Sequence, residues 1–125
     1  MTRIYLASPY TDPDEAVMEN RYYQTLEATA FFLGQKMQVF SPIVYCHPMA
    51  VRHGLPRDAG FWIEFNHSWM DWATEFWILQ LPGWRESTGV AKELRYARNS
   101  FKKIIYYDPE TGTGLDTCIR KGDRT

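Results

Sequence analysis

Short apolar runs alternate along the chain with longer segments of helical periodicity. Residues 3–7 and 76–81 are apolar runs of strand type, and residues 37–40 and 103–107 are similar runs. Continuous apolar runs are typical of parallel strands that helices cover on both faces. The alternation therefore predicts an α/β fold, and we expect a flavodoxin-like three-layer sandwich with a small parallel sheet.

The first helix is predicted over residues 14–35, with Asp14 as a plausible N-terminal cap and Gly34 near its end. Its large apolar positions recur at helical spacing and are predicted to face the sheet. These positions are Tyr22, Tyr23, Leu26, Ala30 and Leu33.

A second, Trp-rich helix is predicted over residues 61–74, and it is apolar on more than one stripe. This pattern indicates burial against both the sheet and another subunit, so we expect a homodimer or a higher homo-oligomer. A third helix opens at Ser87 or Thr88, after the break at residues 82–84, and continues through Phe101.

The longest stretch without periodicity is residues 43–60, which contains prolines, glycines and histidines. Long irregular segments in compact domains are often functional. We therefore interpret residues 43–60 as a loop that forms a lid or a pocket wall. Residues 110–125 are mostly too polar to pack, and they are predicted to form a tail.

The amino-acid composition excludes some classes of function for this protein. The chain has 125 residues and a net charge of −1, with basic residues spread along it, so a nucleic-acid partner is not favoured. An aromatic fraction of 16% suggests ring-lined pockets or a subunit interface in addition to core packing. Cys46 and Cys118 match no zinc or redox spacing. With no signal-peptide pattern and no long apolar span, we expect a cytoplasmic protein that has no membrane partner.

The candidate chemistry lies in residues 87–93, where a strand leads through a loop into a helix. Free backbone N–H groups at a helix N-terminus form an anion site. Glu93 lies in the second turn, and its side chain leans back toward that end. It is not placed for a capping box or for a helical ion pair. Two interpretations stay open from the pattern: a solvated glutamate, or a partly desolvated carboxylate beside an anion pocket.

Three short motifs occur in a fixed order: IYLASPY at residues 4–10, LPGW at 81–84, and S-x-G-x-x-x-E at 87–93. Together they resemble the nucleoside 2-deoxyribosyltransferase-like superfamily, and within it the small uncharacterised branch of the DUF1937 type. The resemblance covers roughly residues 3–107, which places one such domain at 1–109. It implies cleavage of the N-glycosidic bond of a nucleoside or nucleoside 5′-monophosphate, by hydrolysis or base exchange, without a cofactor.

The resemblance also implies roles for individual residues. Glu93 matches the carboxylate nucleophile, and Tyr5 matches a tyrosine that donates a hydrogen bond to it. Ser87 and Gly89 match the loop over the 5′ end of the sugar, where the serine resembles a phosphate ligand, although Ser87 is equally well explained as a helix cap. Ser8 and Tyr10 are candidates to contact the sugar or the base, with turn chemistry beside Pro9 as the alternative.

Asn66 departs from the pattern, because many relatives carry an acidic residue at about this position. An amide forms hydrogen bonds but cannot act as a general acid. Proton delivery to the leaving base is therefore in question, and Asp71 or a water is the expected substitute.

His47 is a candidate contact in the base pocket. It lacks further ligands at usable spacing, so we expect no metal site. Two other functions remain open at this point. One is a non-catalytic nucleotide-binding module of the same fold, and the other is a structural oligomer whose aromatic faces serve assembly.

Overall fold

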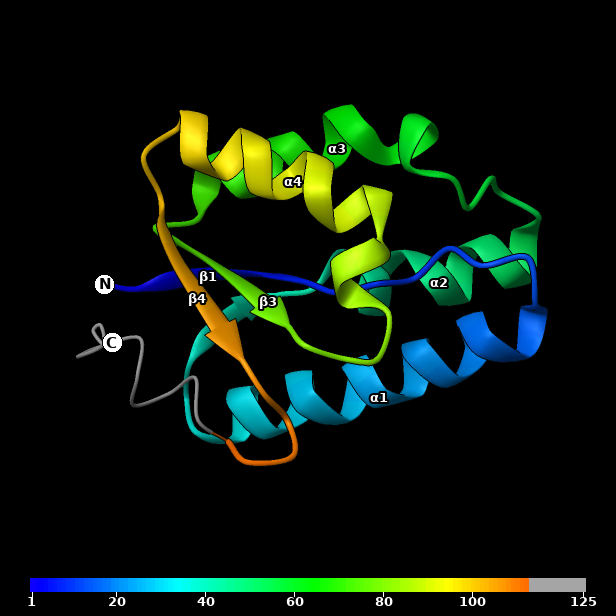
Figure 1. Cartoon of the computed structure of the whole chain (residues 1–125), viewed down its shortest axis with the longest axis horizontal. Helices are drawn as coiled ribbons and strands as arrows, with labels where there is room; N and C mark the ends of the chain where they lie inside the picture. The colour runs from blue at the N-terminus through cyan, green and yellow to red at the C-terminus, as the bar shows by residue number, and fades with distance from the viewer. Residues whose placement is uncertain (113–125) are drawn as a thin grey trace.

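A computed structural model describes residues 1–112 as four parallel strands and four α-helices (Figure 1). The strand order in the sheet is β2-β1-β3-β4, and all three neighbouring pairs are parallel. The α/β fold class is therefore confirmed. The predicted tail falls outside the described residues from position 113 onward. The strands are β1 (Arg3–Ala7), β2 (Gln38–Phe40), β3 (Glu75–Leu79) and β4 (Lys103–Tyr107).

Helices cover both faces of the sheet and make the three layers. The long helix α1 (Glu15–Gly34) lies on one face, whereas α3 (Ala59–Trp72) and α4 (Thr88–Asn99) lie side by side on the other (Figure 1). Helix α2 (Pro42–His53) packs against α1 beyond the end of β2. A short 3₁₀ turn, η1 (Trp84–Glu86), connects β3 to α4.

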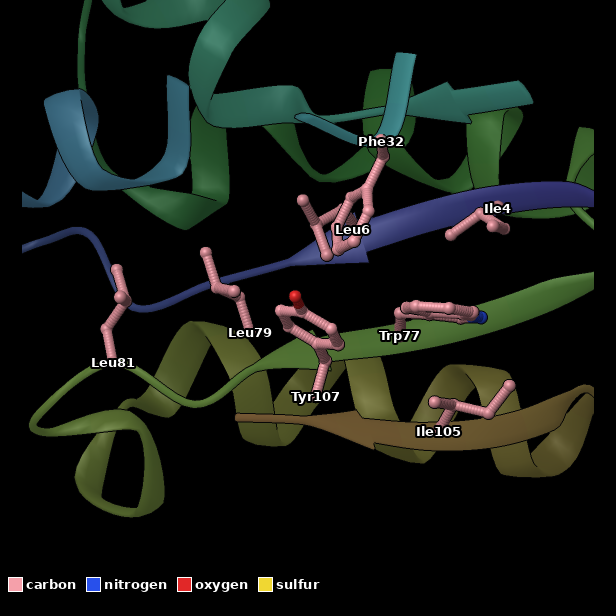
Figure 2. Packing of buried hydrophobic residues seen from close by; sticks show 8 residues of the cluster. All are labelled: Ile4, Leu6, Phe32, Trp77, Leu79, Leu81, Ile105 and Tyr107. Carbon is pink, nitrogen blue, oxygen red and sulfur yellow. The ribbon is translucent and has the colours of Figure 1, made fainter. Parts of the chain in front are cut away.

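Alternation along β1 divides the core into two clusters. Ile4 and Leu6 point toward α1 and pack with Phe32, as Figure 2 shows. Tyr5 and Ala7 point to the opposite face, toward α3 and α4. Successive strand residues face opposite sides of a sheet, so a strand buried beneath two helical layers must be apolar at every position. This arrangement places the Tyr5 side chain on the same side of the sheet as α4.

The face that α1 buries differs from the predicted one. Tyr23 and Leu33 are 55% and 53% exposed, and Ala30 is also exposed, so the prediction that they face the sheet was wrong. The buried residues of α1 are Met18, Thr25, Thr29 and Phe32. Both threonines donate their hydroxyls to the carbonyl four residues earlier, Thr25 to Arg21 and Thr29 to Thr25, each at 2.7 Å. The polar atoms are thus satisfied within the helix, which lets two threonines occupy a core stripe.

The segment predicted as a loop over residues 43–60 is largely helical, which is a second correction. Ser41 caps α2 by accepting a hydrogen bond from the amide of Val44 at 3.2 Å, and Pro42 occupies the first turn. Proline is favoured there because the first helical amides have no internal acceptor. Pro48 lies inside the helix, and Gly54 ends it in a left-handed conformation. A serine–proline pair that resembles a turn is therefore a helix start, and one internal proline did not prevent the helix.

The caps of two helices agree with the sequence, whereas one strand end does not. Asp14 caps α1 by accepting from the amide of Ala16 at 2.9 Å, as predicted, and Ser87 caps α4. The strand expected to reach residue 81 ends at Leu79. Among residues 1–112, no helix combines the length and the apolar character needed to span a membrane.

The Trp-rich helix α3 has a partly open apolar surface. Phe61 is 52% exposed and Ile63 is 38% exposed, whereas Met70 is buried against the sheet. The predicted burial against the sheet is thus found near the C-terminal end of α3. The homo-oligomer expected from the second apolar stripe stays a prediction.

Replacement of Gly83 by alanine should destabilise the fold. Gly83 has φ of +91°, and a Cβ there would lie 2.6 Å from Nη2 of Arg21. The same guanidinium donates to the carbonyls of Tyr10 and Thr11, at 3.3 and 3.2 Å. We expect Gly83→Ala to lower the free energy of unfolding by about 1–2 kcal/mol, from the left-handed backbone alone, as measured by urea denaturation. Gly34→Ala is the control, because its Cβ would meet open space; an equal loss in both variants would contradict this account.

Candidate active site

A cavity of about 560 Å³ opens where β1 and β3 end. β1 lies between β2 and β3 in the sheet, so the connections from β1 to β2 and onward to β3 run to opposite sides of β1. Ligands in open α/β sheets bind at such a point, outside the carboxyl ends of the strands. The walls come from residues 8–11 after β1, one face of α2, residues 57–66, and the first turns of α4.

Glu93 of α4 lines this cavity together with Asn66 of α3. The phenol of Tyr5 donates a hydrogen bond to Oε2 of Glu93 at 2.7 Å. The amide Nδ2 of Asn66 donates to the same oxygen at 3.2 Å. Both bonds end on Oε2, so neither uses Oε1. The three side chains come from β1, α3 and α4, and they meet only because these elements share one face of the sheet.

The ring of Tyr5 is held on both sides. It stacks on Phe76 of β3 with centroids 5.8 Å apart, and it contacts Phe40 of β2 at 6.1 Å. Tyr5 is fully buried. Burial raises the pKa of its phenol well above the usual range, and the nearby Glu93 carboxylate raises it further. Tyr5 therefore stays protonated at physiological pH and acts as a hydrogen-bond donor from a fixed position.

Burial raises the pKa of Glu93 from 4.5 to about 7, although hydrogen bonds from Tyr5 and Asn66 act in the opposite direction. Desolvation disfavours the charged carboxylate, and the two donors favour it. Near neutral pH the side chain is therefore divided between its charged and neutral forms. A carboxylate with this environment, facing a cavity, has the character of a functional group.

Replacement of Tyr5 by phenylalanine should raise the pKa of Glu93 above about 7. The change removes a hydrogen bond that stabilises the charged carboxylate and leaves the ring in place. Carbon-13 NMR titration of the glutamate carboxyl groups measures the shift. Tyr96→Phe is a matched control, because Tyr96 donates to Asp71 at 2.7 Å on an exposed surface. An unshifted Glu93 titration in Tyr5→Phe would mean that the phenol does not influence this carboxylate.

The N-terminus of α4 forms one end of the cavity. The Ser87 hydroxyl accepts from the amide of Val90 at 3.2 Å, so the cap that the sequence suggested is present. The first backbone bond of the helix runs from Ala91 to the carbonyl of Ser87, which leaves the amides of Thr88 and Gly89 without a helical acceptor. Gly89 lines the cavity, and a Cβ there would make only ordinary contact with Ser87.

Tyr10 and His47 form another part of the wall. The Tyr10 hydroxyl is hydrogen-bonded to Nδ1 of His47, whose Nε2 lies 3.2 Å from a carboxylate oxygen of Glu19. His47 is only 4% exposed and stacks on the ring of Tyr22, with centroids 4.3 Å apart. Sequence reasoning selected Tyr10 and His47 but missed Glu19, because nothing in the spacing along the chain brings α1 next to α2.

Two buried polar atoms in the described part of the chain have no hydrogen-bond partner, and both belong to residues that line the cavity. They are Oδ1 of Asn66 and Nη1 of Arg57. Arg57 also forms an ion pair with Glu15 at 2.6 Å, which holds its side chain in the cavity wall. An unpaired buried polar atom costs about 1–3 kcal/mol. A ligand that supplies a donor to Asn66 and an acceptor to Arg57 would recover that cost.

Of the remaining residues that the sequence singled out, some line the cavity and others lie outside it. Ser8 lines the cavity, and its hydroxyl is hydrogen-bonded to the hydroxyl of Thr25 at 3.3 Å. Asp71 is exposed and bound to Tyr96, and it is absent from the cavity wall, a position that does not favour proton delivery. Trp84, the last residue of the LPGW motif, lies beside Arg85 and Tyr106 outside this cavity.

Some wall residues carried no signal in the sequence. Trp62 and Lys92 line the cavity; Trp62 lies outside the motifs, and Lys92 occupies an unspecified position of the motif at residues 87–93. Cys46 is a buried free thiol with a pKa raised to about 12 by burial, so it is not a thiolate nucleophile. Among residues 1–112, no group of three or more His, Cys, Asp or Glu side chains is arranged to hold a metal ion.

Comparison with known proteins finds a matching family model and a similar fold. A family model described as "Domain of unknown function (DUF1937)" matches residues 2–109. Among solved structures, the chain is similar to a 2-deoxyribosyltransferase from the psychrotolerant bacterium Bacillus psychrosaccharolyticus. The TM-score is 0.59 and the identity 21%, over 86% of this chain and 73% of that chain. This likeness shows a shared fold. A search of curated proteins finds no match.

Proposed function

The chain belongs to the DUF1937 family, and we propose that it cleaves the N-glycosidic bond of a nucleoside or a nucleoside 5′-monophosphate. The observation that carries this proposal is the Glu93 carboxylate, which lines a cavity while Tyr5 and Asn66 both donate to its Oε2. Glu93 acts as the nucleophile, Tyr5 and Asn66 position it, and the product is released by hydrolysis or by base exchange.

The arrangement leaves Oε1 of Glu93 to attack the anomeric carbon of the sugar. A bond forms between Oε1 and C1′ as the bond from C1′ to the base nitrogen breaks, and its electron pair leaves with the base. The result is a covalent glycosyl ester, which water or a second base then opens. The transition state carries positive charge on the sugar ring, and an adjacent carboxylate stabilises that charge.

Several wall groups suit a nucleoside. A volume of about 560 Å³ lies within the range that small-molecule pockets span. The unpartnered Oδ1 of Asn66 is an acceptor for a sugar hydroxyl, and it belongs to the same side chain that holds Glu93. A sugar bound to Asn66 would therefore lie beside the nucleophile. Ser8 and Trp62 are candidates to contact the rest of the ligand.

The cavity also has groups that suit a 5′-phosphate on the substrate. The amides of Thr88 and Gly89 at the start of α4, with the Ser87 hydroxyl, form an anion site of the kind found at helix N-termini. Arg57 and Lys92 line the same cavity and add positive charge. Because Asp58 and Glu86 also line it, the phosphate preference rests on the local geometry of α4 rather than on the net charge of the cavity.

The experiment is incubation of the protein with a panel of nucleosides and 5′-monophosphates, with and without a second free base. Chromatography detects released base for a hydrolase and exchanged base for a transferase. Faster turnover of monophosphates than of the matching nucleosides is the expected result. Ligand binding without any base release would instead support a nucleotide-binding module, and the absence of both would exclude this substrate class.

A further inference from the structure

We propose that Tyr10 is the catalytic acid that protonates the departing base, and that His47 and Glu19 supply its proton. This inference rests on the proposed function and adds the proton donor that the glycosidic cleavage requires. The supporting observation is a continuous chain of polar groups that runs from Glu19 through His47 to the Tyr10 hydroxyl. His47 and Tyr10 line the same cavity as Glu93.

A donor is needed because the base leaves with the electron pair of the broken bond. The three groups gathered at the nucleophile do not supply it. Asn66 is an amide, Glu93 must be charged to attack, and the Tyr5 hydroxyl is directed at Glu93. The other ionisable groups that line the cavity are Arg57, Asp58, Glu86 and Lys92, besides the Cys46 thiol.

The surroundings of His47 favour a proton relay. Its Nε2 faces the Glu19 carboxylate at 3.2 Å, and its ring stacks on Tyr22, so a positive charge on the imidazole would have a counter-ion and an aromatic face. The Glu19 side chain is 44% exposed, which connects the buried histidine to solvent. Burial raises the pKa of Tyr10, while the Arg57 guanidinium acts against this, so the phenol stays protonated between turnovers.

Two protons move in one concerted step as the base departs. In the charged state, Nδ1 of His47 donates to the Tyr10 oxygen, and the Tyr10 hydroxyl points to the base. As the C1′–N bond breaks, the Tyr10 proton moves to the base nitrogen and the Nδ1 proton moves to the Tyr10 oxygen. The products are a neutral base, a neutral Tyr10 and a neutral His47 that accepts from Tyr10.

The second half of the reaction restores the donor. Water attacks C1′ of the glycosyl ester and loses a proton to Tyr10, which passes its own proton to Nδ1 of His47. Tyr10 is thus the acid in the first step and the base in the second, as one carboxyl group is in retaining glycosidases. In this scheme Tyr10 touches the reacting atoms, whereas His47 and Glu19 are positioning residues that act through it.

The test compares two substrates that differ in their need for a proton. The base of an ordinary purine nucleoside departs as an anion unless it is protonated. The base of 7-methylguanosine departs as a neutral molecule without any added proton. Tyr10→Phe should lower kcat for the ordinary nucleoside by at least about 100-fold, the usual contribution of a general acid, and change kcat for 7-methylguanosine by less than about threefold. Retained turnover of the methylated substrate also shows that the variant is folded.

Controls separate this role from packing and from the proposed function itself. His47→Gln should show the same substrate-selective loss, whereas Tyr96→Phe and Tyr106→Phe, which change phenols outside the cavity wall, should not. An equal loss on both substrates in Tyr10→Phe, or the same selective loss in Tyr96→Phe, would overturn the inference while leaving the glycosidic cleavage intact. If the unmodified protein releases no base from any nucleoside or 5′-monophosphate of the panel, the proposed function fails, and the inference fails with it.

Discussion

Replacement of Glu93 by glutamine is expected to reduce base release at least about 1,000-fold, while ligand affinity changes by less than about tenfold, because a nucleophile acts mainly in the transition state. The glutamine side chain keeps the size of glutamate and can still contact Tyr5 and Asn66. It cannot form a glycosyl ester, so the chemical step is lost and the cavity remains. Single-turnover assays measure the rate, and isothermal titration calorimetry measures the affinity.

The matched control for this variant is Glu86→Gln. Glu86 lines the same cavity, but it is exposed, whereas the hydrogen bonds of Tyr5 and Asn66 go to Glu93. We expect Glu86→Gln to retain base release within about threefold, as is usual for a surface substitution away from the reacting atoms. If Glu93→Gln retained base release within tenfold of the unmodified protein, Glu93 would not be the nucleophile.

The stability of Glu93→Gln provides an internal check on the fold. Because the pKa of Glu93 is raised from 4.5 to about 7 in the folded state, the folded protein binds this proton more tightly than the unfolded chain does. The contribution of Glu93 to stability is thus full below pH 4.5 and is lost as the pH rises through 7. The midpoint temperature of thermal unfolding of Glu93→Gln, relative to that of the unmodified protein, should therefore rise between pH 5 and 8.

The second large effect is expected in the pH dependence of kcat/KM. Glu93 must be charged to attack, and its pKa of about 7 means that the charged fraction falls tenfold for each pH unit below that value. We expect kcat/KM at pH 5 to be about 100-fold lower than the limiting value that the Glu93 ionisation sets, from this term alone. Initial rates at low substrate concentration, measured in overlapping buffers, define this acid limb.

The position of the acid limb tests the environment of the carboxylate. A limb near 4.5, the ordinary value, would mean that Glu93 is hydrated in solution and lacks the desolvation that surrounds it in the fold. In Tyr5→Phe the limb should move upward with the pKa of Glu93, since the phenol stabilises the charge. A limb that stays in place while the NMR titration moves would assign the acid limb to another group.

The raised pKa of Glu93 links stability to function. Burial that disfavours the charged carboxylate destabilises the fold at neutral pH, but it also makes the charged form more reactive toward a developing sugar cation. Tyr5 and Asn66 counteract part of the desolvation, so that a large fraction of Glu93 remains charged near pH 7. The balance among these three side chains therefore governs both effects.

The local pattern was sufficient for some features of the site. The apolar runs predicted the strands, and Asp14 and Ser87 were identified as caps, because a cap depends on residues only two or three positions away. Glu93 was singled out by its place in the second turn of a helix that follows a strand. Tyr5 was singled out by the motif at residues 4–10 and not by spacing, since its partner lies 88 residues away.

Other features were decided only by the tertiary structure. The buried stripe of α1 contains Thr25 and Thr29, which a hydrophobic pattern cannot select, because their hydroxyls are satisfied by the helix itself. Helix α2 continues past Pro48, and it brings His47 to Tyr10 and Glu19, which come from a loop and from another helix. The sequence by itself determined the sheet, the caps and a carboxylate at a helix start, since these follow from neighbouring residues. Only the packing of α1, α2, α3 and α4 decided which donors meet that carboxylate and which groups share its cavity, because such contacts join segments that are distant along the chain.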